Sequence, residues 1–371
     1  MILKLLASAV LLLAIFAYRN LHHDYSNDRF LTTKGKSSGF KERTYKTADG
    51  STIAYLEGPG NGPDLLLIHG QMVSKEDYAK VLPALSRDFH VFAVDCYGHG
   101  NSSKDPDKYS IRAISDDLTE FMKNVMVEKA YVSGHSSGAL IGARIAAINK
   151  DQVVGFLPED GPFFSTEPGR AEKTFAYSEF QVMADFLAQD AVRNYTMYYF
   201  DHSAMREQFN KDGKDHWSIL VKKPFLKRMK ERGGQMPVVW YYPPKMKLNQ
   251  LVLMTRNLQD KTGAYDLRFG EAFYDFSWFA GFDQETTLKS ITCPTLILHV
   301  APPKSTAPSY YDDNGVLLSA MDEDDARKVN RLIRGSVLKS GFASDHDIHD
   351  DLPKAFLAAV KELKTLAERV Q

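Results

Sequence analysis

The sequence predicts an α/β fold: a mostly parallel, eight-stranded sheet flanked by helices, with an inserted helical cap domain. Short apolar runs alternate with helical patterns from about residue 64 to residue 158, as they do in βαβ units. The alternation stops over residues 161–290, which are rich in aromatic residues and hold all three tryptophans, and it resumes at residue 294. An insertion at this point predicts a cap over the strand ends, where such sheets bind their ligands.

The predicted elements of the core follow one another in the order that this fold requires. Residues 43–47 and 52–56, separated by an Ala-Asp-Gly turn, predict a β-hairpin. Continuous apolar runs then predict strands that helices cover on both faces. The expected strands are 64–70, 90–95, 131–133, 153–158, 294–300 and 336–340, and the expected helices are 74–86, 111–127, 139–146, 322–333 and 353–369.

The motif Gly134-x-Ser136-x-Gly138 lies between a predicted strand and a predicted helix. In that context it predicts a nucleophile elbow, where the chain reverses so sharply that the serine is strained and its neighbours must be small. The start of the helix would also direct backbone N–H groups toward an anion beside Ser136. Without that context, the same five residues are equally compatible with a simple glycine- and serine-rich turn.

Composition places the chain among ordinary globular proteins. It has 371 residues, of which 44% are hydrophobic and 25% charged, with a formal net charge of −1. A net charge so close to zero gives no general attraction to nucleic acid, so we expect no nucleic-acid partner. The composition does not indicate an oligomeric state. We divide the chain into a first core segment (41–160), the cap (161–290) and a second core segment (291–371).

The N-terminal segment, residues 1–20, is predicted to be a signal peptide or a membrane anchor, and residues 21–40 a polar spacer. Residues 5–17 are apolar almost without interruption. That length fits a signal-peptide core better than a membrane span, which needs about 20 residues. A retained anchor stays open because apolar residues flank the run. We therefore expect an exported protein, secreted or membrane-anchored, that faces outside the cytoplasm.

The two cysteines are predicted to be free thiols. Cys96 follows one expected parallel strand, whereas Cys293 precedes another, so they should lie at opposite ends of the sheet. A five-residue strand spans roughly 17 Å, and a disulfide requires Cα atoms within about 7 Å of each other. The geometry of the sheet therefore excludes a disulfide between them.

Four motifs in register make the resemblance to a known family specific. From residue 43 to the C-terminus, the chain resembles the α/β-hydrolase superfamily. The motifs are His69-Gly70, Asp95-x-x-Gly98-x-Gly100-x-Ser102, Gly134-x-Ser136-x-Gly138 and His346 ahead of Pro353. The resemblance implies a nucleophile, an acid and a histidine, in that order along the chain.

Ser136 is the predicted nucleophile, and a serine needs a base that is itself oriented by a third group. Two histidines occur late in the chain, His346 and His349. In the family's catalytic loop the histidine precedes an acidic residue and then a proline that opens the last helix, and this register selects His346. His349 is then expected to pack within the loop or to face the cap.

The acid is predicted to be Asp160. Most members of the family carry the acid shortly after the strand that ends here at Val300, but no carboxylate follows before Asp312. Some members, including many haloalkane dehalogenases, carry it after the strand that precedes the cap, and Asp160 occupies that position. Glu159 should point the other way if strand alternation persists. The alternative is that Asp160 forms a turn and that Asp312 or Asp313 is the acid.

The oxyanion hole is predicted to use the backbone N–H groups of Gln71 and Ser137. No Gly-Gly run follows His69, so the oxyanion loop is not of the His-Gly-Gly-Gly kind. His69, His99 and Asp95 are accounted for by the resemblance as loop residues, and no close pair of ligands accompanies them. We therefore predict no metal centre and no cofactor.

Phe163, Phe164 and Trp278 are the predicted substrate contacts within the cap. Most other aromatic residues, among them those at 240–242, are expected to pack the cap's own core. A pocket lined by aromatic side chains predicts an uncharged acyl or aromatic small molecule as substrate. The basic run 222–230 is more readily explained as a solvated helix face than as a surface that docks on an anionic membrane.

The functional prediction is a serine hydrolase, and specifically a carboxylic-ester hydrolase that forms an acyl-enzyme on Ser136. The dehalogenases and epoxide hydrolases that resemble this chain use an aspartate nucleophile, and Ser136 argues against both activities. Amide, lactone or C–C bond hydrolysis remains an alternative, because these differences lie in cap geometry. The alternative outside enzymes is a receptor that has the same fold and binds a ligand without catalysis.

Overall fold

The core of the protein is one eight-stranded β-sheet. The computed structural model describes residues 2–21, 35–126, 128–192, 194–210, 213–231 and 265–369. The strand order is β1-β2-β4-β3-β5-β6-β7-β8, with antiparallel pairs from β1 to β4 and parallel pairs beyond, which confirms the predicted sheet. The strands are β1 (Lys41–Lys46), β2 (Thr52–Glu57), β3 (Asp64–Ile68), β4 (His90–Val94), β5 (Ala130–His135), β6 (Val153–Glu159), β7 (Leu296–Val300) and β8 (Val337–Phe342).

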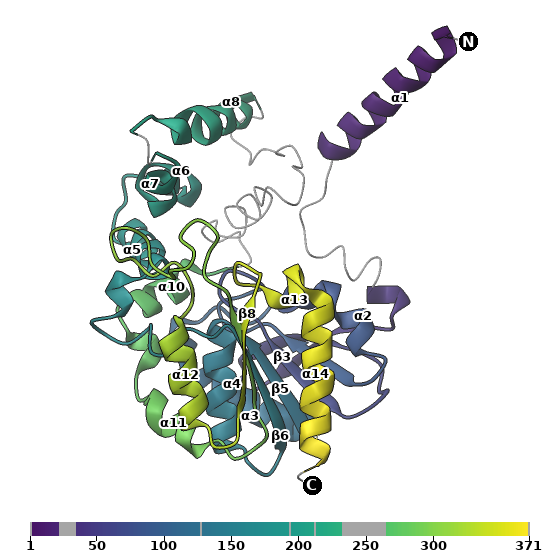
Figure 1. Cartoon of the computed structure of the whole chain (residues 1–371), viewed down its shortest axis with the longest axis vertical. Helices are drawn as coiled ribbons and strands as arrows, with labels where there is room; N and C mark the ends of the chain where they lie inside the picture. Colours follow the sequence, from purple (N-terminus) through teal and green to yellow (C-terminus); the bar gives the residue numbers. More distant parts are fainter. Residues whose placement is uncertain are drawn as a thin grey trace.

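Helices cover both faces of the sheet, as its buried strands require (Figure 1). Alternate residues of β3 belong to different cores: Leu66 and Ile68 pack on the side of α3, α4, α11 and α12, whereas Leu65 and Leu67 pack on the side of η2, α2 and α14. These elements are η2 (Lys75–Lys80), α2 (Leu82–Leu85), η3 (Pro106–Lys108), α3 (Ile111–Phe121), η4 (Met122–Met126), α4 (Ser137–Ile148), α11 (Gln284–Ser290), α12 (Glu323–Leu332), α13 (Ile348–Asp351) and α14 (Pro353–Glu368).

A helical segment lies between β6 and β7, where the sequence predicts the cap. Figure 1 shows α5, α6, α7 and α8 stacked beyond one end of the sheet. Aromatic side chains hold this segment together: Trp217 is buried, and its Nε1 donates to the carbonyl of Phe200 (2.8 Å). The aromatic residues 240–242 lie outside the described residues. The elements are η5 (Ala171–Lys173), α5 (Phe175–Leu187), α6 (Tyr195–His202), α7 (Ala204–Phe209), η6 (Ser218–Lys222), α8 (Lys223–Glu231), α10 (Leu267–Tyr274) and η8 (Ser277–Phe279).

The N-terminal segment forms helix α1 (Ile2–Leu21). Its large apolar side chains from Val10 to Phe16 are exposed. Within the described residues, no helix combines the length and the apolar character that crossing a membrane demands. Export through this segment stays a prediction.

Both cysteines are free, as predicted. Cys96 is buried just beyond the end of β4, and Cys293 lies half-buried ahead of β7. Burial raises the pKa of the Cys293 thiol to about 11, so this thiol stays protonated at neutral pH.

The glycine-rich loop after β4 is built around the buried carboxylate of Asp95. Its Oδ1 accepts the backbone N–H of Lys75 (2.7 Å), and its Oδ2 accepts Nζ of Lys75 (2.8 Å) and the N–H of Asn101 (2.9 Å). A Cβ at Gly100 would overlap the same carboxylate, which explains why only glycine fits there. The Ser102 hydroxyl closes the loop by donating to the carbonyl of Asp95 (2.7 Å). The motif Asp95-x-x-Gly98-x-Gly100-x-Ser102 therefore shapes this loop.

We predict that Lys75→Met lowers the free energy of unfolding by about 3 kcal/mol, because it leaves the fully buried Asp95 charge without its cation. Urea unfolding followed by circular dichroism measures the change. Glu42→Gln is the matched control, since Glu42 also lies close to Lys75 Nζ (3.1 Å) but is 39% exposed. That variant should change stability by less than about 1 kcal/mol. Equal effects of the two substitutions would contradict this account of the loop.

Candidate active site

The predicted sharp reversal between strand and helix is present at Ser136. This residue lies between β5 and α4, with φ 53° and ψ −124°, a conformation that non-glycine residues rarely adopt. A Cβ at Gly134 would overlap the carbonyl of Gly138, and one at Gly138 would overlap the carbonyl of Ile68. The Ser136 N–H donates to the carbonyl of Glu159 on the neighbouring strand (3.0 Å). Glycine is therefore required on both sides of the strained serine.

Asp160 and His346 are joined by a hydrogen bond, although they are 186 positions apart in the sequence. His346 Nδ1 donates to Asp160 Oδ2 over 2.6 Å. Asp160 directly follows β6 and is fully buried. Burial would raise the pKa of its carboxyl, but hydrogen bonds from His299 and His346 hold that pKa well below its ordinary value. Burial would lower the pKa of His346, but the Asp160 carboxylate outweighs it and raises this pKa to about 9.

His346 and the loop after β3 both lie against the elbow. The centroid of the His346 ring is 4.5 Å from that of His135, the residue directly before Ser136. On the loop side, a Cβ built on Gly70 would come within 2.9 Å of Ser136 Cβ. The structure therefore places His346, which is bound to Asp160, beside the residue that precedes Ser136, and places the predicted oxyanion loop against Ser136 itself.

His299 is a second partner of Asp160 that sequence reasoning did not assign. It is fully buried on β7, and its Nδ1 donates to Asp160 Oδ1 (3.0 Å), an oxygen that also accepts the Val300 N–H (3.4 Å). Both carboxylate oxygens are thus hydrogen-bonded, which fixes the orientation of the acid. The available signal was a single histidine inside the apolar run 294–300.

The alternative histidine, His349, is fully buried and holds its loop to the end of β6. Its backbone N–H and its Nδ1 both donate to the Glu159 carboxylate, over 2.7 Å and 3.0 Å. Glu159 and Asp160 therefore contact different histidines, as strand alternation predicts. The alternative acid, Asp312, accepts two backbone N–H groups of its own turn, and Asp313 is exposed.

The two predicted oxyanion donors flank Ser136. Ser137 is the first residue of α4, so its backbone N–H has no acceptor within the helix. Gln71 follows Gly70, and its side-chain Oε1 accepts the hydroxyl of Tyr265, a residue that precedes α10 (2.6 Å). The Gln71 Nε2 is buried without a hydrogen-bond partner among the described residues. The loop after β3 is therefore hydrogen-bonded to the cap through Tyr265, and the Gln71 Nε2 donor is available to a ligand.

The three predicted substrate contacts are fully buried. Phe163 and Phe164 follow the acid, and the ring of Phe164 lies under Nζ of Lys328 (3.5 Å). The ring of Trp278 packs 4.4 Å from that of Phe273. All three pack within the core, and their contact with a substrate stays a prediction.

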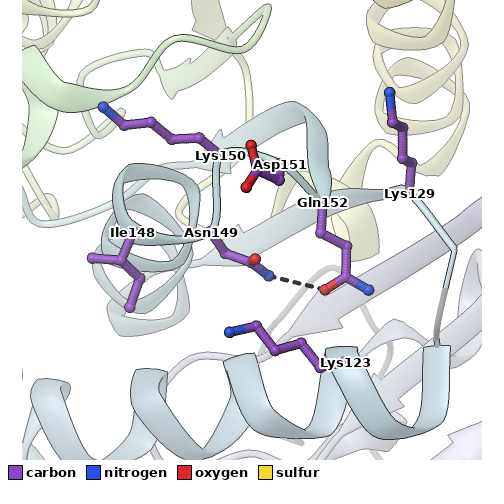
Figure 2. Close-up of a pocket in the computed structure, with 7 residues that line it drawn as sticks. All are labelled: Lys123, Lys129, Ile148, Asn149, Lys150, Asp151 and Gln152. Carbon is purple, nitrogen blue, oxygen red and sulfur yellow. Dashed lines mark hydrogen bonds between the residues drawn. The ribbon is translucent and has the colours of Figure 1, made fainter.

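A surface pocket at the far end of α4 is separate from the elbow (Figure 2). Ser136 precedes the first residue of this 12-residue helix, whereas Ile148 is its last. A helix of that length spans about 18 Å. The pocket is lined by Lys123, Lys129, Ile148, Asn149, Lys150, Asp151 and Gln152.

Comparison with known proteins identifies relatives for much of the chain. Residues 63–301 match the family described as alpha/beta hydrolase fold. Fluoroacetate dehalogenase from Burkholderia sp. is 36% identical over 127 residues, which cover 33% of this chain and 41% of that enzyme. Soluble epoxide hydrolase from Corynebacterium sp. is 33% identical over 94 residues, 25% of this chain and 33% of the enzyme. The chain thus spans less than half the length of these two relatives.

Among solved structures, a putative lipase from Acinetobacter baumannii superimposes with a TM-score of 0.61. The alignment covers 94% of this chain and 99% of the other, at 15% sequence identity. At such identity the likeness establishes a shared fold.

We predict that Gly134→Ala destabilises the protein by about 2 kcal/mol, because the added methyl group must displace the first turn of α4. Gly60→Ala is the matched control: Gly60 is exposed and a Cβ there meets no atom within 4 Å. The control should stay within about 0.5 kcal/mol of the wild type. Thermal unfolding of both variants measures the difference, and a harmless Gly134→Ala would contradict the close packing of the elbow.

Proposed function

Because the chain belongs to the α/β-hydrolase family, we propose that it is a serine hydrolase, and specifically a carboxylic-ester hydrolase. Ser136 attacks the carbonyl carbon, His346 takes the hydroxyl proton, and Asp160 orients the imidazole. The backbone N–H groups of Gln71 and Ser137 stabilise the oxyanion. The observation that carries the proposal is the 2.6 Å hydrogen bond between Asp160 and His346 beside the strained serine.

The second half of the reaction uses the same groups. His346 returns the proton to the departing alcohol, which leaves an acyl ester on Ser136. The imidazole then activates a water molecule, whose attack releases the acid and restores the serine. The hydrogen bond from His346 Nδ1 to Asp160 supports this role, because the carboxylate stabilises the imidazolium that forms in each half.

The chemistry of a serine nucleophile supports a carbonyl substrate over a halide or an epoxide. Displacement at a saturated carbon by the Ser136 hydroxyl would leave an ether, which water does not cleave by this route. Attack on a carbonyl leaves an ester, which the same histidine and oxyanion hole can hydrolyse. A substrate with an acyl group is therefore the one that a serine at the elbow can turn over.

The surroundings of the oxyanion loop support an uncharged substrate. The buried Gln71 Nε2 has no partner among the described residues, and leaving such a donor unpaired costs about 1–3 kcal/mol. A substrate oxygen that accepts from it would recover this energy. Aromatic side chains make up most of the buried apolar residues described in the cap, and they would provide apolar walls for an acyl or aromatic group.

We predict that a fluorophosphonate probe labels the wild-type protein covalently and that Ser136→Ala abolishes the labelling. Ser137→Ala is the matched control, because only the backbone N–H of that residue takes part, and it should still be labelled. Mass spectrometry of the intact protein gives the stoichiometry. A panel of p-nitrophenyl esters of graded length, with amides and lactones beside it, then identifies the bond cleaved. An unlabelled wild-type protein would favour a receptor that binds without turnover.

We predict that Asp160→Asn lowers kcat on the best ester by about 10³- to 10⁴-fold, since the amide no longer holds the imidazole in its working tautomer. KM should change little, because the Asp160 side chain is fully buried behind His346. Asp312→Asn, which alters the alternative acid, should keep near wild-type kcat. Circular dichroism confirms that both variants fold. If Asp312→Asn were the inactive variant, the assignment of the acid would be wrong.

A further inference from the structure

A second cluster of titratable side chains lies beside the elbow, separate from the three catalytic residues. It consists of Asp77 on η2, His135 at the end of β5 and His349 on α13. One potential ligand atom from each lies within 4.8 Å of the others. Asp77 Oδ2 is 3.1 Å from His349 Nε2 and 3.7 Å from His135 Nδ1. Three separate elements therefore present one carboxylate and two imidazoles to a common point.

The side chains of this cluster are buried, and His135 lacks hydrogen-bond partners within the described part of the chain. His135 is 3% exposed and His349 is fully buried. Both ring nitrogens of His135 are buried without a hydrogen-bond partner among the described residues, and Nε2 of His349 and Oδ2 of Asp77 are buried 3.1 Å from each other. Each such group costs about 1–3 kcal/mol when it is left unpaired. Their convergence indicates a shared ligand that satisfies all of them together.

The outer nitrogens of both histidines lie beside further carboxylates. His349 Nδ1 donates to Glu159, and His135 Nε2 is 3.2 Å from Asp347 Oδ1. Histidines that bind a metal usually hold a carboxylate or carbonyl on their other nitrogen, which fixes the ring and its tautomer. This arrangement leaves His349 Nε2 and His135 Nδ1, the two nitrogens nearest Asp77, free to bind a cation.

The donors also select the kind of ion. Two imidazole nitrogens and one carboxylate oxygen suit zinc and its neighbours, whereas calcium and magnesium require mostly oxygen ligands. Tetrahedral zinc with bonds of 2.0–2.1 Å places its ligand atoms about 3.3 Å apart. The two separations from Asp77, 3.1 Å and 3.7 Å, bracket this spacing, and the two histidine nitrogens lie within 4.8 Å of each other. Three nearby carboxylates, those of Asp77, Glu159 and Asp347, would offset a charge of +2.

Although the sequence predicts no metal centre, we propose that Asp77, His135 and His349 form a buried binding site for one divalent transition-metal ion, with Zn²⁺ preferred. The ion would join η2, β5 and α13. Since His135 directly precedes Ser136 and His349 lies on the loop of His346, it would stabilise the surroundings of the active site without taking part in the reaction.

The test uses the full-length, tag-free protein carrying Ser136→Ala, so that the result does not depend on hydrolase activity. After chelator treatment and removal of the chelator, the protein is titrated with ZnCl₂ in a calorimeter, and with CoCl₂ while the visible absorption is recorded. We expect one equivalent of Zn²⁺, a visible Co²⁺ spectrum typical of a tetrahedral site with nitrogen ligands, and a higher melting temperature with zinc. CaCl₂ and MgCl₂ should bind much more weakly.

Asp77→Asn and His349→Gln should each weaken Zn²⁺ binding more than about 100-fold, since loss of even an outer partner of a ligand costs about 10- to 100-fold. His90→Gln is the matched control. His90 also contacts two carboxylates, Asp64 (3.1 Å) and Glu57 (3.3 Å), but no second histidine joins that described cluster, so this variant should bind as the parent protein does.

Two results would overturn the proposal. One is a parent protein that binds no zinc and gives no tetrahedral Co²⁺ spectrum, which would make the cluster a charge network of Asp77, Glu159 and a protonated His349. The other is binding that survives Asp77→Asn and His349→Gln. The Co²⁺ spectrum of the parent protein decides the question even if a variant fails to fold.

Discussion

The buried carboxylate of Asp160 is the constraint on which the arrangement of the site depends. A charge without solvent must be paired and hydrogen-bonded, or its burial is prohibitively costly. Asp160 meets that requirement through His346, His299 and the backbone of Val300. The strand order supplies these partners, because β6 lies between β5, which leads to Ser136, and β7, which carries His299. Adjacent strand ends thus deliver the nucleophile, the acid and a histidine that fixes the acid.

Consecutive acidic residues at the end of β6 hold the histidine loop at two points. Asp160 binds the imidazole of His346. The Glu159 carboxylate accepts hydrogen bonds from both the imidazole and the backbone N–H of His349. Because successive side chains of a strand point to opposite sides, one strand end can contact two histidines three positions apart. His349 is fully buried, whereas His346 is partly exposed. The contact between Glu159 and His349 therefore anchors the loop, and the contact between Asp160 and His346 presents an imidazole to the elbow.

Much of the core could be predicted from the sequence, because its signals are local. Apolar runs mark the buried strands, and the glycines around Ser136 report steric limits that the structure shows directly. Asp160 required the family resemblance as well as the lack of a carboxylate after Val300. The contact of His299 with Asp160 could not be predicted from local sequence signals, because it depends on β6 and β7 being neighbours in the sheet. The Asp77, His135 and His349 cluster was equally hidden, because three distant elements create it.

A crystal structure of the protein after reaction with a phosphonate ester tests the central claim most directly. We expect phosphorus bonded to Ser136 Oγ, and the phosphonyl oxygen hydrogen-bonded to the backbone N–H groups of Gln71 and Ser137. His346 Nε2 should lie within hydrogen-bond distance of the modified oxygen, with Asp160 still bound to Nδ1. An adduct on another residue, or an imidazole of His346 turned away from the adduct, would contradict the account.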